Sequence, residues 1–540
     1  MPGMRSSLAL LTAAACSAAS APPTIWPQPL IAISHNETVT VLGQEPDISF
    51  FTASVITPFL QSAFQRYVPL TFPHQTTPAA PGTQGLRGLM VYVEDVSQER
   101  PDLDTDEGYT IDVPTSGIGA VSAKTVFGAL RALETFSQLV RFDFDSGRYV
   151  IDGAPWRIED RPRFPHRGLM VDTSRHFQSL ASLRAIIDTL PYAKINVLHW
   201  HIVDAQSFPF ESKSSPKLWQ GSYSPSERYT QVDAASIVEY ARLRGVRVVP
   251  EFDMPGHADS WCVGYPHICP STTCRTPLNV ASNATFDLIE ALLSEVTGNK
   301  PGAGLFPDSF LHLGGDEVNT DCWTKTPAVA AWLKAHNMTA DQGYAHFTKR
   351  VATMALEQGR RPVQWNEVYD HFKTALPKKT VVHVWTSVTN VTEVAANGYN
   401  MLRNMGYFNY SWYLDNLNVD WRGVYQNEPC ESIPTEELCK KVLGGHGEMW
   451  GETVDASDLQ QTVWPRMASI AEKLWSSREH TQDVAAALPR IQNFRCLLLE
   501  RGVAAAPVEN AMARSAPAGP GSCYPRPGAA EVRGFQQLMI

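Results

Sequence analysis

The pattern of apolar and polar positions divides the chain into two parts. In the first part, strand-like runs at Gly88–Glu94, Gly108–Val113 and Tyr149–Ile151 accompany one stripe of apolar residues at helical spacing between Ala123 and Val140. Strands beside a single helix favour a small α+β domain, which we place at residues 22–164.

From Arg167 onward, short apolar runs alternate with amphipathic helix patterns, such as the i, i+3, i+4, i+7 spacing that ends at Leu190. This alternation over residues 165–500 predicts an α/β fold, a closed (β/α)8 TIM barrel, with residues 501–540 as a C-terminal tail. A doubly wound open sheet is the alternative, but no glycine-rich dinucleotide fingerprint follows any strand. The predicted barrel strands are Gly168–Asp172, Ile195–His201, Val246–Asp253, Phe310–Gly314, Pro362–Asn366, Val381–Trp385, Asn400–Asn404 and Val442–His446.

Residues 1–21 have the organisation of a signal peptide. Arg5 precedes the apolar run Leu8–Ala15, and small residues follow, with cleavage expected after Ala19 or Ala21. We therefore expect entry into the secretory pathway, followed by secretion or by delivery to a vacuole or lysosome. No later run approaches the ~20 apolar residues of a membrane span. The formal net charge of −10 disfavours nucleic acid as a partner.

The cysteines and sequons fit that route. Once Cys16 leaves with the signal, an even number of cysteines remains, which in a secreted chain predicts disulfides. They are too dispersed for a zinc site, and proximity alone suggests the pairs Cys262–Cys269 and Cys430–Cys439. The other four are Cys274, Cys322, Cys496 and Cys523. Candidate N-glycosylation sites are Asn36, Asn283, Asn337, Asn390 and Asn409.

The clearest candidate for chemistry is Asp316-Glu317, which follows an apolar approach and the pair Gly314-Gly315. Neighbouring side chains on a strand point to opposite faces, so these carboxyl groups share a site only if the strand has ended. Glycine permits that change of direction. Two carboxyl groups held together titrate as a pair, and one acid beside one carboxylate suits proton donation with charge stabilisation. A surface Asp-Glu after a tight turn is the alternative.

The predicted strand ends are rich in polar and aromatic residues. Barrel enzymes build their sites at these ends. Flat indole faces beside carboxylates and an arginine suit a sugar ring, which has apolar C–H faces and a hydroxyl rim. The residues at these ends include Asp172, Arg175, His176, His199–His201, Asp204, Glu251–Asp253, His257, Trp365–Glu367, Trp385, Trp412–Asp415 and Glu448–Glu452.

A metal site is a second interpretation of some of these residues. The ligands of a barrel metallohydrolase would be His199, His201, Asp253, His257 and Asp316. Such a site also needs ligands from later strands, where Trp365 and Trp385 cannot ligate. Histidines that hydrogen-bond to nearby carboxylates explain the pattern more simply, so we predict no metal and no cofactor.

Taken together, these motifs resemble family 20 glycoside hydrolases, in particular the eukaryotic, fungal-like β-N-acetylhexosaminidases. The resemblance runs from about Trp26 to Cys523. It implies an exo-acting, retaining enzyme (EC 3.2.1.52) whose substrate supplies its own nucleophile through an oxazolinium intermediate. The matching stretches are Phe164–Phe177, Asn196–Asp204, Glu251–His257, His312–Val318 and Met449–Glu452.

The resemblance implies a role for each site residue. Glu317 matches the residue that protonates the glycosidic oxygen and then deprotonates water. Asp316 matches the carboxylate that orients the acetamido N–H and stabilises positive charge, and Tyr413 would hold the acetamido carbonyl. By the same resemblance, Trp365, Trp385 and Trp450 would wall the acetamido pocket, Arg175, Asp415 and Glu452 would bind outer hydroxyls, and Asp204 and His257 would support Glu317.

Substrate and assembly are narrowed by the same resemblance. Family members that accept 6-sulfated sugars are expected to carry a neutral-plus-basic pair where this chain has Asp415-Asn416, so we expect neutral terminal GlcNAc or GalNAc, in chitooligosaccharides or glycans. The family pattern also implies the disulfides Cys274–Cys322 and Cys496–Cys523, and it allows a homodimer. A barrel that binds glycans without catalysis is the alternative function.

Overall fold

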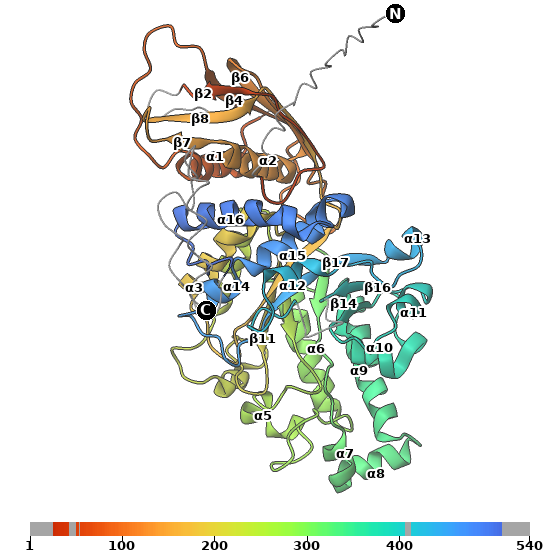
Figure 1. Ribbon diagram of the computed structural model, residues 1–540. Helices are drawn as coiled ribbons and strands as arrows, with labels where there is room; N and C mark the ends of the chain where they lie inside the picture. Colours follow the sequence, from red (N-terminus) through yellow and green to blue (C-terminus); the bar gives the residue numbers. More distant parts are fainter. Residues whose placement is uncertain (1–24, 43–49, 53–54, 405–411, 510–540) are drawn as a thin grey trace, which may run out of the picture.

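The computed structural model describes residues 25–42, 50–52, 55–404 and 412–509. It contains a smaller N-terminal α+β domain and a closed barrel of parallel strands with helices around it, as the sequence predicted (Figure 1). The predicted signal peptide lies outside these residues. Among the helices that the structure describes, none has the length and apolar character needed to cross a membrane.

The N-terminal domain is organised around a six-stranded sheet in the order β1-β9-β5-β6-β4-β3. Helix α2 covers it and was predicted from its apolar stripe, whereas helix α1 was not predicted, although Phe59, Ala63 and Tyr67 have helical spacing. The elements are β1 (Ile31–Ile33), β3 (Phe50–Thr52), α1 (Pro58–Thr71), β4 (Leu86–Asp95), β5 (Tyr109–Val113), β6 (Gly117–Thr125), α2 (Val126–Leu139) and β9 (Trp156–Asp160), with a second sheet of β2 (Glu37–Thr40), β8 (Arg148–Ala154) and β7 (Arg141–Asp143).

The barrel closes by pairing its first strand with its last. All eight strands are parallel and follow one another around the barrel in sequence order. Their residues are buried almost throughout, which is why apolar residues predominate in these runs of the sequence. The strands are β10 (His166–Asp172), β11 (Val197–Val203), β12 (Arg247–Phe252), β13 (Phe310–His312), β14 (Arg361–Trp365), β15 (Val381–Val384), β16 (Asn400–Arg403) and β17 (Val442–Met449).

Helices and short turns connect these strands. The α-helices are α3 (Leu180–Thr189), α4 (Gln231–Arg242), α5 (Trp261–Gly264), α6 (Asn283–Thr297), α7 (Asp321–Lys325), α8 (Pro327–Ala335), α9 (Ala340–Glu357), α10 (Asn366–Phe372), α11 (Val391–Ala396), α12 (Trp421–Gln426), α13 (Glu436–Cys439), α14 (Leu459–Val463), α15 (Arg466–Trp475) and α16 (Val484–Glu500). The 3-10 turns are η1 (Leu190–Ala193), η2 (Pro216–Gly221), η3 (Pro266–Ile268), η4 (Lys373–Ala375) and η5 (Arg478–Thr481).

Helix α16 lies between the N-terminal domain and the barrel (Figure 1). Just after it, Arg501 pairs with Glu134 of α2 at 2.9 Å, and both side chains are buried. Arg501 also donates to Ser137 at 2.7 Å. Val503 and Ala505, in the segment predicted as a tail, are buried as well, so the start of that segment belongs to the packed structure.

A buried polar cluster joins the two domains. Glu107 of the N-terminal domain pairs with Arg167 of β10 at 2.6 Å and with Arg131 of α2 at 2.7 Å. Asp160, at the end of β9, pairs with Lys194 at 3.0 Å. Buried charges are tolerated only when they are paired, so these contacts fix how the small domain docks on the barrel.

Candidate active site

A glycine turn ends the fourth barrel strand. β13 stops at His312, and Gly314 and Gly315 follow with φ of 64° and 97°. A Cβ on Gly314 would lie 1.7 Å from Asp253 Oδ1, so only glycine fits there. The N–H of Gly315 donates to the same oxygen over 2.9 Å. The strand therefore ends before the carboxyl pair, as the two glycines predicted.

Asp316 and Glu317 both reach the same imidazole. His257 Nε2 lies 3.6 Å from Asp316 Oδ2 and 3.5 Å from Glu317 Oε2. The side chain of Asp316 is 10% exposed, whereas that of Glu317 is 61% exposed. Glu317 also has a φ of 49°, a left-handed conformation that is uncommon for a residue with a Cβ and that clusters at functional sites.

Acids and imidazoles alternate along a chain that leads from Glu317 into the barrel. His257 Nδ1 lies 3.1 Å from Asp204 Oδ1, and His201 Nε2 lies 2.9 Å from Asp204 Oδ2. Arg175 also pairs with Asp204, at 2.9 Å. His257 thus contacts both acids, and Asp204 lies directly behind it.

The buried acid and the exposed acid have opposite pKa shifts. Burial raises the pKa of Asp316, whereas the hydrogen bond with His257 lowers the pKa of Glu317. Burial disfavours the charged form of His257, but Asp316 and Asp204 outweigh it and raise the pKa of this imidazole well above its usual range. The sequence argument places the proton on Glu317, so the structure shifts the two carboxyl groups in the other direction.

Asp253 explains how Asp316 can still carry a charge. Burial, followed by the negative charge of Asp316, raises the pKa of Asp253 well above its usual range. Carboxyl oxygens of Asp253 and Asp316 also lie within 4.8 Å of each other. Two carboxyl groups in contact hold one proton between them, and a proton on Asp253 leaves Asp316 ionised.

Aromatic side chains gather at the ends of β14, β15 and β17. The rings of Trp365 and Trp450 lie 6.0 Å apart, and those of Trp385 and Tyr413 lie 6.2 Å apart. Tyr413 forms a β-bridge with Glu448, which holds the Tyr413 segment against β17. Trp365 is only 1% exposed, so it lies at the bottom of this aromatic group.

Carboxyl groups fix two of the indoles, the buried Trp365 and the partly buried Trp385. Trp365 Nε1 donates to Glu251 at 2.9 Å. Trp385 Nε1 donates to both oxygens of Glu367, at 3.0 and 2.9 Å. Burial and the charge of Asp316 raise the pKa of Glu367 to about 8. An anchored indole keeps one plane, which is what a shaped sugar pocket needs.

Charged residues form the outer edge of the site. Arg175 pairs with Asp172 at 2.8 Å and with Glu452 at 3.5 Å, and its guanidinium lies 5.0 Å from the centre of the Trp450 ring. Burial, with the nearby charge of Glu452 as a further contribution, raises the pKa of Asp415 to about 6. Arg175, Asp415 and Glu452 thus share one rim.

Four of the five residues of the metal interpretation come together, whereas His199 lies in a separate group with Glu251 and His312. Asp253, His257 and Asp316 offer ligand atoms within 4.8 Å of one another, as do His201, Asp204 and Asp253. Both imidazoles, however, bond to carboxylates, and the pKa of each is raised well above its usual range. A protonated imidazole has no lone pair for a metal, so the hydrogen-bonded interpretation fits these residues better.

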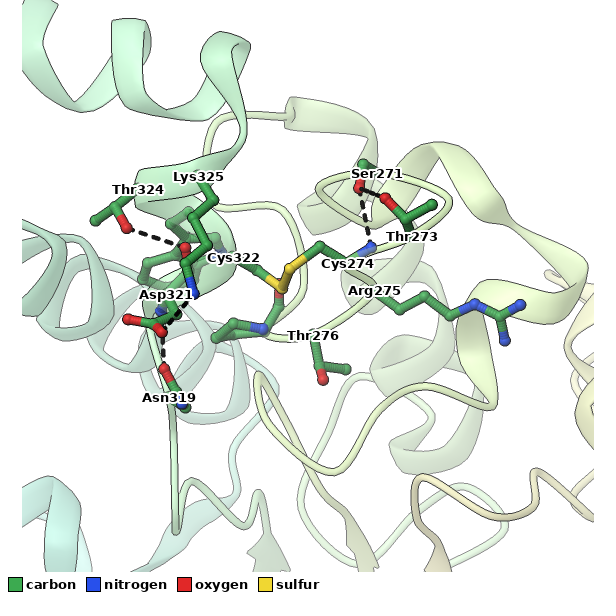
Figure 2. The surroundings of a disulfide bond; sticks show 12 residues. Ser271, Thr273, Cys274, Arg275, Thr276, Asn319, Asp321, Cys322, Thr324 and Lys325 are labelled. Atoms are coloured by element: carbon green, nitrogen blue, oxygen red, sulfur yellow. Dashed lines mark hydrogen bonds and ion pairs between the residues drawn. A yellow bond between two sulfur atoms is a disulfide. The ribbon is translucent and has the colours of Figure 1, made fainter.

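Three disulfides are present among the described residues. Cys262 pairs with Cys269, Cys274 with Cys322, and Cys430 with Cys439. The second joins the segment before α6 to the start of α7, a few residues beyond Glu317 (Figure 2). Cys523 lies outside the described residues, so its pairing with Cys496 stays a prediction.

The candidate glycosylation sites lie on the surface where the structure describes them. Asn36, Asn283, Asn337 and Asn390 are exposed. The side chain of Asn390 also caps α11 by accepting a hydrogen bond from the N–H of Glu393 over 3.1 Å. Asn409 lies outside the described residues.

Three carboxyl groups of the site were given no role in the predicted sugar-binding arrangement. Asp253, Glu251 and Glu367 are in contact with predicted residues and control their charge or orientation. Each lies at or near a strand end already noted as polar. That position was the available signal, but the sequence does not show which strand-end side chains are buried.

Comparison with known proteins agrees with this geometry. The family model described as "Glycosyl hydrolase family 20, catalytic domain" matches residues 164–478, and the model "beta-acetyl hexosaminidase like" matches residues 25–139. Beta-hexosaminidase 1 of Arabidopsis thaliana is 42% identical over 532 residues, which cover 94% of this chain and 95% of that protein. Beta-hexosaminidase 3 of Arabidopsis thaliana is 45% identical over 446 residues, covering 82% of this chain and 81% of that protein.

A solved structure has the same architecture. The chitobiase of Flavobacterium johnsoniae superposes with a TM-score of 0.75 at 28% identity, covering 89% of this chain and 73% of that one. The barrel, its paired carboxyl groups and its anchored indoles define a glycosidase. More specifically, the chain belongs to glycosyl hydrolase family 20, which confirms the resemblance noted in its motifs.

Proposed function

We propose that the protein is an exo-acting β-N-acetylhexosaminidase that hydrolyses terminal, non-reducing β-linked GlcNAc or GalNAc in chitooligosaccharides or glycans. The observation that carries the proposal is the placement of a buried carboxyl group and an exposed one against a single imidazole, beside an aromatic pocket. One group can hold a charge while the other exchanges a proton.

The first step breaks the glycosidic bond. The oxygen of the substrate's acetamido carbonyl attacks C1, the bond from C1 to the leaving oxygen breaks, and Glu317 gives that oxygen its proton. The product is an oxazolinium ion, in which the acetamido oxygen is bonded to C1 of the same sugar. Asp316, ionised while Asp253 holds the shared proton, accepts the acetamido N–H and faces the positive charge.

The second step opens the oxazolinium ion. Glu317 takes a proton from water, the water oxygen attacks C1, and the bond from C1 to the acetamido oxygen breaks. Each step inverts C1, so the product keeps the β configuration. The pocket of Trp365, Trp385 and Tyr413 excludes water and holds the acetamido group against C1, which is catalysis by positioning.

Glu317 needs a proton for the first step although His257 lowers its pKa. Its side chain is 61% exposed, so a bound sugar covers much of it. Removing water from a carboxyl group raises its pKa, and substrate therefore favours the protonated form. The same exposure lets water reach Glu317 in the second step.

Arg175, Asp415 and Glu452 are proposed to bind the outer hydroxyls. Their carboxylates accept hydroxyl protons and the guanidinium donates, and together they form one rim. The carboxyl group of Asp415 repels an anionic sulfate, which favours neutral sugars.

The test compares two proteins and two substrates. Wild-type enzyme should hydrolyse a chromogenic β-GlcNAc, and the Glu317→Gln variant should be slower by about 10²–10⁴-fold. The matching glycoside without the N-acetyl group should be a very poor substrate for the wild type. Equal cleavage of the two glycosides would remove the substrate-assisted mechanism, and equal rates for the two proteins would remove Glu317 from its role. No hydrolysis by the wild type would leave a glycan-binding barrel. A chelator should leave the activity unchanged.

We further infer passage through the secretory pathway to the outside, a vacuole or a lysosome, and assembly as a homodimer. The signal-like start, the disulfides and the exposed sequon asparagines support the first inference. A mobility shift on deglycosylation tests the route. Light scattering on the purified protein tests the dimer, and a monomer mass would overturn it.

A further inference from the structure

One buried carboxylate, Glu251, lies below the acid pair at the end of β12 and has a relative exposure of 0%. Its Oε2 accepts from His201 Nδ1 at 2.7 Å and lies 2.8 Å from His199 Nε2. Its Oε1 accepts from Trp365 Nε1 at 2.9 Å and lies 3.1 Å from His312 Nδ1. Both oxygens of one side chain are therefore surrounded by nitrogen atoms from three other strands.

The Oε2 side of Glu251 leads to the acid/base group. His201 bonds to Glu251 with one ring nitrogen and to Asp204 with the other, at 2.7 and 2.9 Å. Asp204 bonds to His257, which reaches Glu317. Negative and positive groups alternate along this path, so the charge at each position favours the opposite charge at the next.

The Oε1 side leads to the floor of the sugar pocket. Trp365 is 1% exposed, and its indole stacks on His383 with ring centres 4.2 Å apart. The hydrogen bond from its N–H to Glu251 fixes the direction in which the ring points within the plane of stacking. The ring lies 6.0 Å from that of Trp450, so its angle contributes to the shape of the pocket.

We propose that Glu251 is a positioning residue that links the two parts of the catalytic machinery, the His201–Asp204–His257 chain behind Glu317 and the indole floor of the acetamido pocket. The inference rests on the proposed hexosaminidase function and adds a residue that touches neither acid directly. The carboxylate orients His201 and Trp365 at once, so the acid/base group and the pocket keep a fixed relation.

A purely structural role is the competing interpretation, and the barrel provides a matched control. Glu448 of β17 is also fully buried and also bonds within a cluster of histidines and an amide, namely His383, His446 and Asn404. Within the described residues, its side chain bonds neither to Trp365 nor to the chain behind Glu317. Glu448→Gln thus removes a buried core charge that is not a direct partner of Glu251, Trp365 or the chain behind Glu317, and its link to Trp365 runs only through His383, on which the indole stacks.

The charges around both ends of the path define the expected pH effect. Facing Glu251 are His199 and His201 from β11 and His312 from β13, with Asp253 and Asp316 nearby. Facing Glu317 are His257, Arg175 and Asp204. Removing the negative charge of Glu251 leaves this set more positive, which lowers the pKa of the remaining carboxyl groups.

The experiment measures kcat and KM for a chromogenic β-GlcNAc across pH in full-length wild type, Glu251→Gln and Glu448→Gln. We expect Glu251→Gln to lower kcat/KM by about 10²-fold, because the acid/base group loses its orientation. The variant should also move the alkaline limb of the kcat/KM–pH profile to lower pH. Glu448→Gln should keep the wild-type limb. If both variants lose the same factor and keep that limb, Glu251 is structural and the proposal is overturned.

Two further variants separate the branches. Trp365→Phe removes the indole N–H that Glu251 accepts, together with part of the aromatic surface, and should raise KM about fivefold with an unchanged pH limb. His201→Asn breaks the path between Glu251 and Asp204 and removes the positive charge of His201. It should therefore move the alkaline limb to higher pH, opposite to Glu251→Gln, with little change in KM. Should Glu251→Gln not fold, a His201→Asn enzyme with the wild-type limb overturns the proposal. The underlying function is tested separately. The wild type should cleave the N-acetyl glycoside but not its analogue without the N-acetyl group, and Glu317→Gln should lose that activity.

Discussion

The acid pair consists of two halves with opposite surroundings. Asp316 is buried against Asp253, whereas most of the Glu317 side chain is open to solvent. Burial suits a group that must hold one charge in one place, and exposure suits a group that must gain, give and regain a proton. The difference shows how adjacent residues of one turn can perform unlike tasks.

The largest expected effect comes from neutralising each half in turn. Asp316→Asn and Glu317→Gln should each lower kcat by about 10²–10⁴-fold. A leaving group that departs without protonation should recover much of the rate in Glu317→Gln and little in Asp316→Asn. Rates for a series of aryl β-GlcNAc substrates measure this. An equal recovery in the two variants would erase the distinction between the halves.

A smaller effect is expected at the imidazole that both halves share. His257 lowers the pKa of Glu317, so His257→Asn should raise it. The first step needs protonated Glu317, so activity persists below that pKa and is lost as pH rises through it. The alkaline limb of kcat/KM should therefore move to higher pH in the variant, with kcat about 10-fold lower at its optimum. A limb that stays in place would mean that another group sets it.

The anchor of Trp385 should matter less. Glu367→Ala removes the acceptor for the indole N–H and should raise KM about fivefold, the worth of one hydrogen bond. Glu367→Gln retains an accepting oxygen and serves as the control, with KM close to the wild-type value. Identical KM values for Ala and Gln would show that packing alone holds the ring.

The smallest effect is expected at the rim. Asp415→Asn removes a charge that is partly open to solvent, so neutral substrates should lose only about two- to threefold in kcat/KM. The same change should increase activity on a 6-sulfated substrate by a similar factor, because repulsion of the anion is relieved. A variant that gained nothing on the sulfated substrate would contradict the proposed selection for neutral sugars.

The barrel was readable from the sequence because its strands are buried on both faces. Runs such as Val381–Val384, three valines and one histidine, are mostly apolar and stand between helical patterns, so the number and order of the strands could be predicted. Their ends were less certain. β13 stops at His312 and β17 continues to Met449, because pairing with neighbouring strands rather than local composition decides where a strand ends.

The sequence predicted which residues form the site better than it predicted their protonation. Motif positions identified Asp316, Glu317 and His257, and the structure brings all three together. The direction of each pKa shift depends on burial and on Asp253, a residue far away in the chain. Glu251 was missed for the same reason, since only the closed barrel shows that it contacts three other strands.

The pairing of Arg501 with Glu134 joins a late residue to the first domain. During translation, the segment that carries Glu134 leaves the ribosome long before Arg501 is added. In that interval the Glu134 carboxylate lacks the Arg501 guanidinium with which it pairs when buried. Leaving one buried charge unpaired costs about 3–5 kcal/mol. Final docking of the N-terminal domain therefore waits for the end of translation, and a chain cut just before residue 501 should be degraded rather than merely less active.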